Sequence, residues 1–366
     1  MNSPSRLSYL ELALTPYVGP VSLLKLLQRF EDISAVWSAS ANQLNDILTS
    51  QAISAIHKRQ GQQALQDALA WESKAHNHRL LCLLDEDYPM NLAQIDAPPS
   101  MLFVKGQCSL LHQHSIAIVG SRHATAQGLK NAQQFAHALS QKGLVIVSGM
   151  ASGIDTAAHQ GTLEANGHTM AVIGTGIDRV YPASNRALAH QICENGLLVS
   201  EFPLQTPPVA SNFPRRNRII AALSEAVLVV EAAKQSGSLI TAQLALEMNK
   251  DVMAIPGSIH NTQSKGCHAL IKQGAKLVEC SEDILEELQI SPQTKPLATC
   301  QDNTPLINSN KPSSKLLEQM GFDPIHPDQL VDKLGISATD VYAELLELEL
   351  QGLIALIAGG RYQRIH

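Results

Sequence analysis

The residues best suited to chemistry in this 366-residue chain form an arginine-rich run at 213–220, which reads Phe-Pro-Arg-Arg-Asn-Arg-Ile-Ile. No acidic residue occurs between Glu201 and Glu225. The guanidinium group is planar and permanently charged, and it matches a phosphate with two parallel hydrogen bonds. Phe213 adds an aromatic face on which a base can stack. The run therefore indicates phosphate or nucleic-acid binding, with a solvated basic turn as the alternative.

The spacing of the arginines predicts how a helix would present them. Pro214 suits the first position of a helix, where its missing N–H would have no partner anyway. In that helix Arg215 and Arg218 lie three residues apart on one face, whereas Arg216 points elsewhere. The apolar residues 219–223 would bury the opposite side. We expect Arg215 and Arg218 each to neutralise one phosphate, with internal pairing as the alternative for Arg216.

Glycine- and serine-rich turns follow several predicted strands, and they suit the same ligand. Glycine lets the backbone approach a ligand closely, and a helix start offers unpaired N–H groups and a positive dipole end to an anion. One such turn is ordinary chain reversal, but several at one sheet edge beside arginines indicate a phosphate-binding surface. The turns and the basic run supply the candidate DNA-binding residues: Gly120, Ser121, Arg122, Ser148, Gly149, Gly153, Arg186, Phe213, Arg215, Arg216, Asn217, Arg218, Ser236, Gly237 and Ser238.

Apolar strands that alternate with amphipathic helices must position these turns. Two short strand-like runs, Leu80–Leu84 and Met101–Val104, lead into seven further strands. These are predicted at Ser115–Val119, Leu144–Val147, Thr169–Ile173, Leu197–Ser200, Ala226–Val230, Val252–Ile255 and Lys276–Val278, with a helix at Gln127–Lys142 between the first two. This alternation predicts an α/β fold with an extended Rossmann-like, doubly wound parallel sheet. Ligands of such sheets bind beyond the carboxyl ends of the strands, where the strand order reverses.

Helical and linker segments flank the sheet domain, which is expected over residues 81–290. Residues 1–80 predict helices joined by a turn at Thr15–Pro20, as in a helix-hairpin-helix or SAM-like unit. The usual second glycine of that turn is missing, so we favour packing over DNA contact there. Residues 291–313 contain four prolines and no aromatic residue, which predicts a mobile linker. Residues 314–366 predict three helices and a hairpin, the order of a winged helix.

The longest helix predicted in the winged helix, Ser337–Gln351, has an unusual charge for a DNA reader. It contains no Lys or Arg and carries carboxylates at Asp340, Glu344, Glu347 and Glu349. Recognition helices normally bring cations to phosphates and base edges. We therefore expect this helix to contact protein or to be autoinhibitory, and not to enter a DNA groove.

The overall composition excludes several classes of protein. No apolar run approaches the ~20 residues needed to cross a bilayer, and the N-terminus lacks the build of a signal peptide. The six cysteines are scattered without a Cys-x-x-Cys pair, which argues against zinc and a disulfide framework and for a cytoplasmic location. The formal net charge of -6 allows nucleic-acid binding only where basic residues are concentrated locally.

Three other patterns are weaker indications of function. The Gly-x-Gly turn at 174–176 lacks the third glycine of a dinucleotide-binding turn, so NAD binding is discounted. Asp155 and His159 lie four residues apart and could form an acid–base pair, but an Asp in the first turn more often stabilises its helix. Glu201 and Glu231 follow strands without a partner nucleophile or metal cluster. We therefore predict no catalytic residue, no metal and no cofactor.

Six motifs in one order resemble the DNA-processing protein A family (DprA, also called Smf). They read VGSR, SGMASGIDTAAH, IGTGIDRVYPASNRAL, NFPRRNRIIAALS, SGSLITA and AIPGSIHNTQSKGCHALI, and they span about residues 115–290. The resemblance implies a cytosolic, non-enzymatic protein of competence and natural transformation that dimerises through its Rossmann-like domain. It also implies that the protein binds and protects incoming single-stranded DNA, displaces single-strand-binding protein and loads the RecA recombinase.

The resemblance also implies which arginines bind DNA. The family uses the arginine of its Gly-Ser-Arg turn and the basic residue after Pro-x-x-Asn, which correspond to Arg122 and Arg186. The alternative function is a nucleotide-binding phosphohydrolase of the lysine-decarboxylase-like type, because Gly/Ser turns can also hold a nucleotide phosphate. Those enzymes carry Pro-Gly-Gly-x-Gly-Thr followed by a Glu, whereas the nearest stretch here, residues 237–241, reads Gly-Ser-Leu-Ile-Thr.

Overall fold

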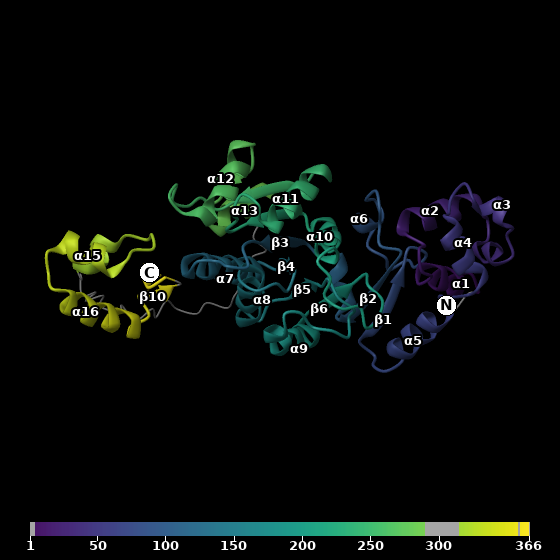
Figure 1. The fold of residues 1–366 in the computed structure, drawn as a ribbon, viewed down its shortest axis with the longest axis horizontal. Helices are drawn as coiled ribbons and strands as arrows, with labels where there is room; N and C mark the ends of the chain where they lie inside the picture. The colour runs from purple at the N-terminus through teal and green to yellow at the C-terminus, as the bar shows by residue number, and fades with distance from the viewer. Residues whose placement is uncertain (1–3, 290–314, 358, 366) are drawn as a thin grey trace, which may run out of the picture.

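The computed structural model describes residues 4–289, 315–357 and 359–365, so the predicted linker at 291–313 lies outside the described residues. Figure 1 shows N-terminal helices, a central α/β body and a C-terminal helical unit following one another along the long axis of the molecule. No helix in the described ranges has the length and apolarity needed to cross a membrane.

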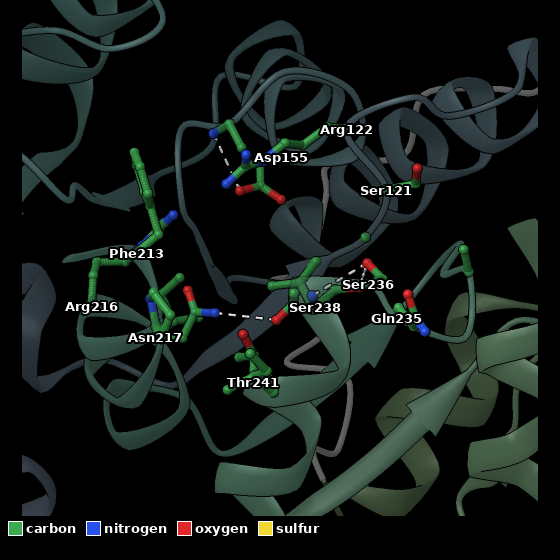
Figure 2. Close-up of a pocket in the computed structure, with 18 of the residues that line it drawn as sticks. Ser121, Arg122, Asp155, Phe213, Arg216, Asn217, Gln235, Ser236, Ser238 and Thr241 are labelled. Atoms are coloured by element: carbon green, nitrogen blue, oxygen red, sulfur yellow. Dashed lines mark hydrogen bonds between the residues drawn. The ribbon is translucent and has the colours of Figure 1, made fainter. Parts of the chain in front are cut away.

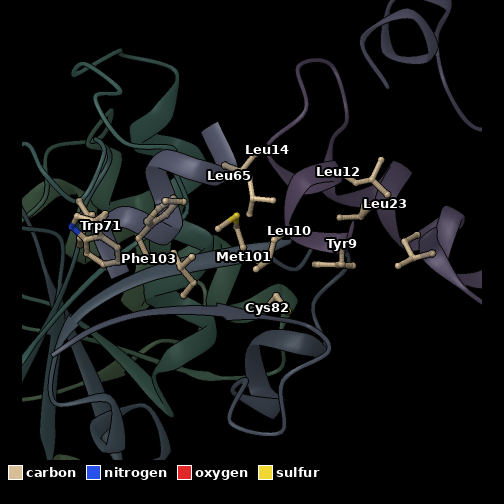
Figure 3. Packing of buried hydrophobic residues seen from close by; sticks show 14 of the residues in the cluster. Tyr9, Leu10, Leu12, Leu14, Leu23, Leu65, Trp71, Cys82, Met101 and Phe103 are labelled. Carbon is tan, nitrogen blue, oxygen red and sulfur yellow. The ribbon is translucent and has the colours of Figure 1, made fainter. Parts of the chain in front are cut away.

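The N-terminal part is helical, as predicted, and packs directly on the sheet. Its helices are α1 (Pro4–Ala13), α2 (Pro20–Arg29), α3 (Ala41–Leu44), α4 (Ser50–His57) and α5 (Gln62–Glu72). Leu10 and Leu12 of α1 share one hydrophobic cluster with Phe103 of the sheet (Figure 3). Trp71 of α5 lies edge-on to the same Phe103, with ring centroids 5.5 Å apart. These helices therefore cover one face of β1 and β2.

A nine-stranded, mostly parallel sheet forms the centre of the molecule. The strands are β1 (His78–Cys82), β2 (Met101–Gly106), β3 (Ser115–Val119), β4 (Val145–Ser148), β5 (Thr169–Val172), β6 (Leu197–Ser200), β7 (Ala226–Val229), β8 (Asp251–Ala254) and β9 (Lys276–Leu277). Their order is β1-β2-β6-β5-β4-β3-β7-β8-β9. The seven strands from β6 to β9 are parallel, whereas β2 pairs antiparallel with both β1 and β6. All nine predicted strands lie within two residues of these bounds.

Helices cover both faces of the sheet. They are α6 (Met90–Ala93), α7 (Ala126–Gln141), α8 (Ile154–Glu164), α9 (Arg186–Asn195), α10 (Asn212–Leu223), α11 (Gly237–Glu247), α12 (Lys265–Lys272) and α13 (Ser281–Glu287). One hydrophobic cluster joins the sheet to α7 and α8, and another joins its other face to α10, α11 and α12. The chain winds from β3 towards β6 in one direction and from β7 towards β9 in the other, so the strand order reverses between β3 and β7.

The C-terminal unit has the helices and hairpin of a winged helix, as predicted. It contains α14 (Lys315–Met320), α15 (Pro327–Leu334), α16 (Ala338–Leu350), β10 (Ile354–Ile357) and β11 (Arg361–Arg364). A small core that includes Leu330, Val341 and Leu345 holds it together. The unit contacts the α/β body where the backbone N–H of Gln127 donates to Oε1 of Gln363, at 3.4 Å.

Candidate nucleic-acid interface

A pocket of about 680 Å³ opens at the carboxyl ends of β3 and β7, where the strand order reverses. Figure 2 shows side chains from the turn after β3, from α8, from α10 and from the start of α11 facing this space. Nine of the predicted residues line the pocket: Gly120, Ser121, Arg122, Phe213, Arg216, Asn217, Ser236, Gly237 and Ser238. The other six, Ser148, Gly149, Gly153, Arg186, Arg215 and Arg218, do not line it.

The turn after β3 is held tightly by backbone hydrogen bonds. The N–H of Ser121 donates to the carbonyl of Glu231 at 2.7 Å, and the carbonyl of Ser121 accepts from the N–H of Ile154 at 3.2 Å. A Cβ at Gly153, where φ is 80°, would overlap this same turn. Gly153 therefore lets the start of α8 approach the turn, and its role is to support the pocket without lining it.

Two buried groups near the pocket are structural. Ser148 is fully buried and its hydroxyl donates to the carbonyl of Ile118 at 2.7 Å, so it is turned away from any ligand. Glu231 accepts from the N–H and the hydroxyl of Thr125, at 2.9 and 2.6 Å, and so holds the start of α7. The prediction that Ser148 contacts a ligand directly is therefore wrong.

The start of α11 forms the opposite wall. Ser236 is its N-cap, and the Ser236 hydroxyl accepts from the N–H of Ser238 at 3.4 Å. The side-chain amide of Asn217 donates to the carbonyl of Gly237 at 3.2 Å, which ties α10 to α11. A Cβ at Gly237 would meet nothing within 4 Å. The start of α11 therefore borders open space, and the positive end of its dipole favours an anion there.

Aromatic rings and a cation meet at the mouth of the pocket. The guanidinium carbon of Arg122 lies 5.2 Å from the ring centroid of Phe213. Tyr181, which sequence reasoning did not select, is 47% exposed, and its ring centroid is 5.7 Å from that of Phe213. Its position immediately before the Pro-x-x-Asn motif at 182–185 was a usable signal, because an aromatic near a basic residue is typical of single-strand binding. The mouth of the pocket thus combines two aromatic rings, Tyr181 and Phe213, with the positive charge of Arg122.

Arg216 forms the floor of the pocket and is only 4% exposed. One guanidinium N–H donates to the carbonyl of Val172 at 2.8 Å, while Nε has no partner among the described residues. Burial, and to a smaller extent the nearby Arg122, lower the pKa of Arg216 to about 10, against the opposing effect of Asp155. The buried charge of Arg216 is thus only partly offset by hydrogen bonds and by Asp155, and an anionic ligand would supply the missing hydrogen-bond acceptors.

Asp155 and Gly149 fix the position of that guanidinium. The Asp155 carboxylate accepts from the N–H groups of Gly149 and Ala151, at 3.1 and 3.3 Å. Burial raises the pKa of Asp155, while Arg216 and these donors oppose the rise. A Cβ at Gly149 would overlap the guanidinium of Arg216. Gly149 is therefore needed because the side chain of Arg216 crosses directly over its backbone.

Replacing Gly149 by alanine is expected to displace Arg216 from the floor of the pocket. The overlap must be relieved by moving a buried side chain, which costs about 1–3 kcal/mol of the free energy of unfolding. Nucleic-acid affinity should fall together with stability, and denaturant unfolding and a binding titration measure the two. Gly19→Ala is the matched control, because a Cβ at Gly19 meets nothing within 4 Å. Unchanged stability in Gly149→Ala would contradict the packing described.

Asp155 and His159 do not form the acid–base pair considered from the sequence. His159 is fully buried, and its Nδ1 lies 2.6 Å from the hydroxyl of Thr169, which itself donates to the carbonyl of Ile146. Burial lowers the pKa of His159 to about 3, so the ring stays neutral at physiological pH. Each residue is bound to partners of its own, which agrees with the structural role favoured from the sequence.

Arg215 and Arg218 lie on one face of α10, as predicted, but that face meets a carboxylate. Arg218 forms an ion pair with Glu201, and Arg215 lies 3.8 Å from the same carboxylate oxygen. Burial raises the pKa of Glu201 and lowers that of Arg218, against their mutual attraction. The expectation that Arg218 neutralises a phosphate stays a prediction, and its ion pair with Glu201 disfavours it. Helix α10 also begins at Asn212, two residues earlier than Pro214 predicted.

Arg186 lies outside the pocket, at the first residue of α9. It is exposed and lines a neighbouring groove of about 400 Å³, which the pocket meets at Tyr181 and Pro208. The sequence-based expectation of one rim carrying both Arg122 and Arg186 is thus replaced by two adjoining hollows. No cluster of metal-ligating side chains occurs in the ranges that the structure describes.

Comparison with known proteins identifies the family to which this fold and these motifs belong. The family profile for DNA recombination-mediator protein A matches residues 79–289, and that for the DprA winged helix domain matches 301–360. Protein Smf of Escherichia coli is 39% identical over 339 residues, which cover 89% of each chain. DNA processing protein DprA of Streptococcus pneumoniae is 47% identical over 207 residues, which cover 57% of this chain and 73% of that protein.

Two solved structures share the architecture. The X-ray structure of DprA from Streptococcus pneumoniae superposes with a TM-score of 0.68 at 39% identity, over 76% of this chain and 97% of that one. A structure of DNA processing protein A from Helicobacter pylori, described for its single-stranded DNA binding mode, superposes with a TM-score of 0.54 at 29% identity, over 60% and 98% of the two chains. By its profile match, its relatives and its fold, this chain belongs to the DNA recombination-mediator protein A family, the DprA/Smf proteins.

Proposed function

We propose that this protein binds single-stranded DNA in the pocket between β3 and β7. The observation that carries the proposal is the floor of the pocket, where Arg216 is buried without a full set of partners. Arg122 at the mouth and the helix start at Ser236 add positive potential around the same space. A DNA phosphate is an anion that all three can share. The relative from Helicobacter pylori, described for single-stranded DNA binding, supports this choice of ligand.

The aromatic faces explain why the strand would be single. Phe213 and Tyr181 stand at the mouth of the pocket, and Tyr181 is about half exposed. An unpaired base can stack on such a ring, whereas the bases of a duplex are already stacked on each other. Phosphate contacts carry no base information, so binding should be largely independent of sequence.

The wider role that we propose is that of a non-enzymatic, cytoplasmic mediator of natural transformation. The protein would protect incoming single-stranded DNA, displace single-strand-binding protein and load RecA, acting as a homodimer. A dimer presents two pockets to one strand and so raises affinity through effective concentration. The support is membership of the DprA/Smf family. Sedimentation should show a dimer at micromolar concentration, and a strict monomer would contradict this part of the proposal.

A direct binding comparison tests the central proposal. Fluorescence anisotropy with a labelled homopyrimidine strand and with the corresponding duplex should show preferential binding of the single strand. Equal affinity for both forms would contradict the role given to the aromatic faces. Incubation with nucleoside monophosphates tests the phosphohydrolase alternative, and release of free base or sugar phosphate would favour that enzyme.

Removing residues 291–366, which include the winged helix, is expected to leave affinity for single-stranded DNA intact. The exposed surface of α16 carries the apolar side chains Tyr342, Leu346 and Leu350 and the exposed carboxylate Glu347, and α16 contains no Lys or Arg. Such a surface repels a polyanion and suits contact with protein. The measurement is a titration of the truncated and full-length chains on one labelled strand. A loss of affinity above about tenfold would show that the winged helix binds DNA.

A further inference from the structure

A groove leads away from the pocket along α9 and reaches the amino ends of the parallel strands. It is lined at one end by Tyr181, Arg179 and Arg186 and at the other by His190 and Lys105. It meets the pocket at Tyr181 and Pro208, which line both. The hollow at the switch point and this groove therefore adjoin each other on the surface, separated only by Tyr181 and Pro208.

Helix α9 sets the direction of the groove. Arg186, His190 and Cys193 are spaced four and three residues apart, so they lie on one face of the helix. The helix begins after β5, near the carboxyl ends of the parallel strands, and ends at Asn195, immediately before β6 begins. Its ten residues span about 15 Å. The groove thus runs along the strand direction, from the carboxyl ends of the parallel strands towards their amino ends.

The antiparallel strand β2 provides the facing wall. Lys105 pairs with Leu198, which places Lys105 beside the amino end of β6. A second hollow, of about 570 Å³, continues past this point and shares Lys105, His190 and Cys193 with the groove. It ends at His76 and Asn77, just before β1. The antiparallel strands β1 and β2 therefore border a second hollow that continues from the end of the groove.

The charged groups along the groove and this second hollow favour an anion. Arg179 and Arg186 are exposed, and Lys105 is half-buried with its charge near Cys193. Two carboxylates also line them: Asp178, which accepts the N–H of Gln205 at 2.8 Å, and Glu194 at the far end. Arg179 and Arg186 line the end of the groove nearer to the pocket, and Lys105 lies at the far end. These cations are concentrated here although the whole chain has a net charge of −6. Local concentration of cations on an acidic protein indicates a specific phosphate path.

We infer that single-stranded DNA continues from the pocket past Arg186 and along α9, with further phosphates on Arg179 and Lys105. This inference rests on the proposed function, because the pocket supplies the anchored end of the strand. A 15 Å path accommodates about four stacked nucleotides at roughly 3.4 Å per phosphate. The bound length is thus set by the groove and exceeds what the pocket alone can hold.

The test compares a short and a long strand, roughly six and twenty thymidines. The variant combines Lys105→Gln with Arg179→Gln, which removes two charges and leaves shorter, neutral polar side chains. Its affinity for the long strand should fall about tenfold, and its salt slope should flatten by about 1.4 log units per decade of salt, at roughly 0.7 for each lost phosphate contact. Binding of the short strand, which occupies the pocket, should stay within about twofold of wild type.

Two controls make the result specific. Arg29→Gln combined with Lys142→Gln removes the same charge at exposed positions on α2 and at the end of α7, and it should leave both strands unaffected. Arg122→Ala should weaken both strands. If the groove variant matches wild type on the long strand, or weakens both strands equally, the path along α9 is wrong while the pocket stands. If wild type binds neither strand, the proposed function fails and the path fails with it.

Discussion

Replacing Arg216 by methionine is expected to lower affinity for single-stranded DNA by about 10- to 150-fold, the equivalent of about 1.5–3 kcal/mol for a hydrogen bond to a charged group. Arg216 is buried at the floor of the pocket, where its Nε lacks a described partner. A phosphate that enters the pocket meets a donor already stripped of water, so the contact is strong. Methionine keeps much of the volume and removes the charge and the donors.

The same substitution should change the stability of the unliganded protein less than it changes the affinity for DNA. Arg216 makes one hydrogen bond, to the carbonyl of Val172, and the cost of burying its charge opposes that gain. Asp155 keeps its two backbone donors when the cation is removed. Asp155 nevertheless loses its nearby cation while it stays buried, so we expect the free energy of unfolding to fall by about 1–2 kcal/mol, less than in Arg218→Met. Denaturant titration of the free protein provides the measurement.

Arg218→Met is the matched control on the same helix, and its effects should be reversed. Arg218 is paired with Glu201, whose side chain is 4% exposed, so its removal leaves a buried carboxylate with only the distant Arg215. Breaking a buried pair in this way costs about 3 kcal/mol of stability. Affinity for DNA should change little, because Arg218 does not line the pocket. If Arg218→Met loses affinity and Arg216→Met does not, the two roles have been assigned the wrong way round.

Replacing Arg122 by alanine is expected to weaken binding to every sequence alike and to reduce its salt dependence. Arg122 lies at the mouth of the pocket, over the ring of Phe213. Each phosphate contact on a single strand contributes about 0.7 to the slope of log affinity against log salt, so the slope should flatten by that amount. The equal loss on all sequences follows because a phosphate contact reads no base.

A salt titration on a homopyrimidine strand measures both quantities. Arg122→Lys should recover the slope but only part of the affinity, since lysine supplies the charge without the planar pair of donors. Arg29→Ala, at an exposed position on α2, is the control and should behave as wild type. An Arg122→Ala protein with the slope and affinity of wild type would show that Arg122 is not on the phosphate path.

The sequence alone determined the sheet and the position of the pocket. Buried apolar runs alternating with amphipathic helices predicted all nine strands within two residues, because that pattern is typical of a parallel sheet covered by helices. Parallel strands place their carboxyl ends at one edge, so the turns at Gly120–Arg122 and Ser236–Ser238 were expected to meet, and both line the pocket. The antiparallel pairing of β1 and β2 depended on long-range contacts with β6 and was not predicted.

Only the tertiary structure decided what each arginine of the run does. Arg215, Arg216 and Arg218 are near neighbours with the same chemistry, and a helix predicts only that two of them share a face. Their roles depend on Glu201, which follows β6, and on Asp155 in α8, which the fold brings to different sides of α10. Burial and charge pairing act across these long-range contacts, and they leave Arg218 neutralised and Arg216 incompletely compensated. Local spacing carries no information about such partners, because the fold selects them from distant parts of the chain.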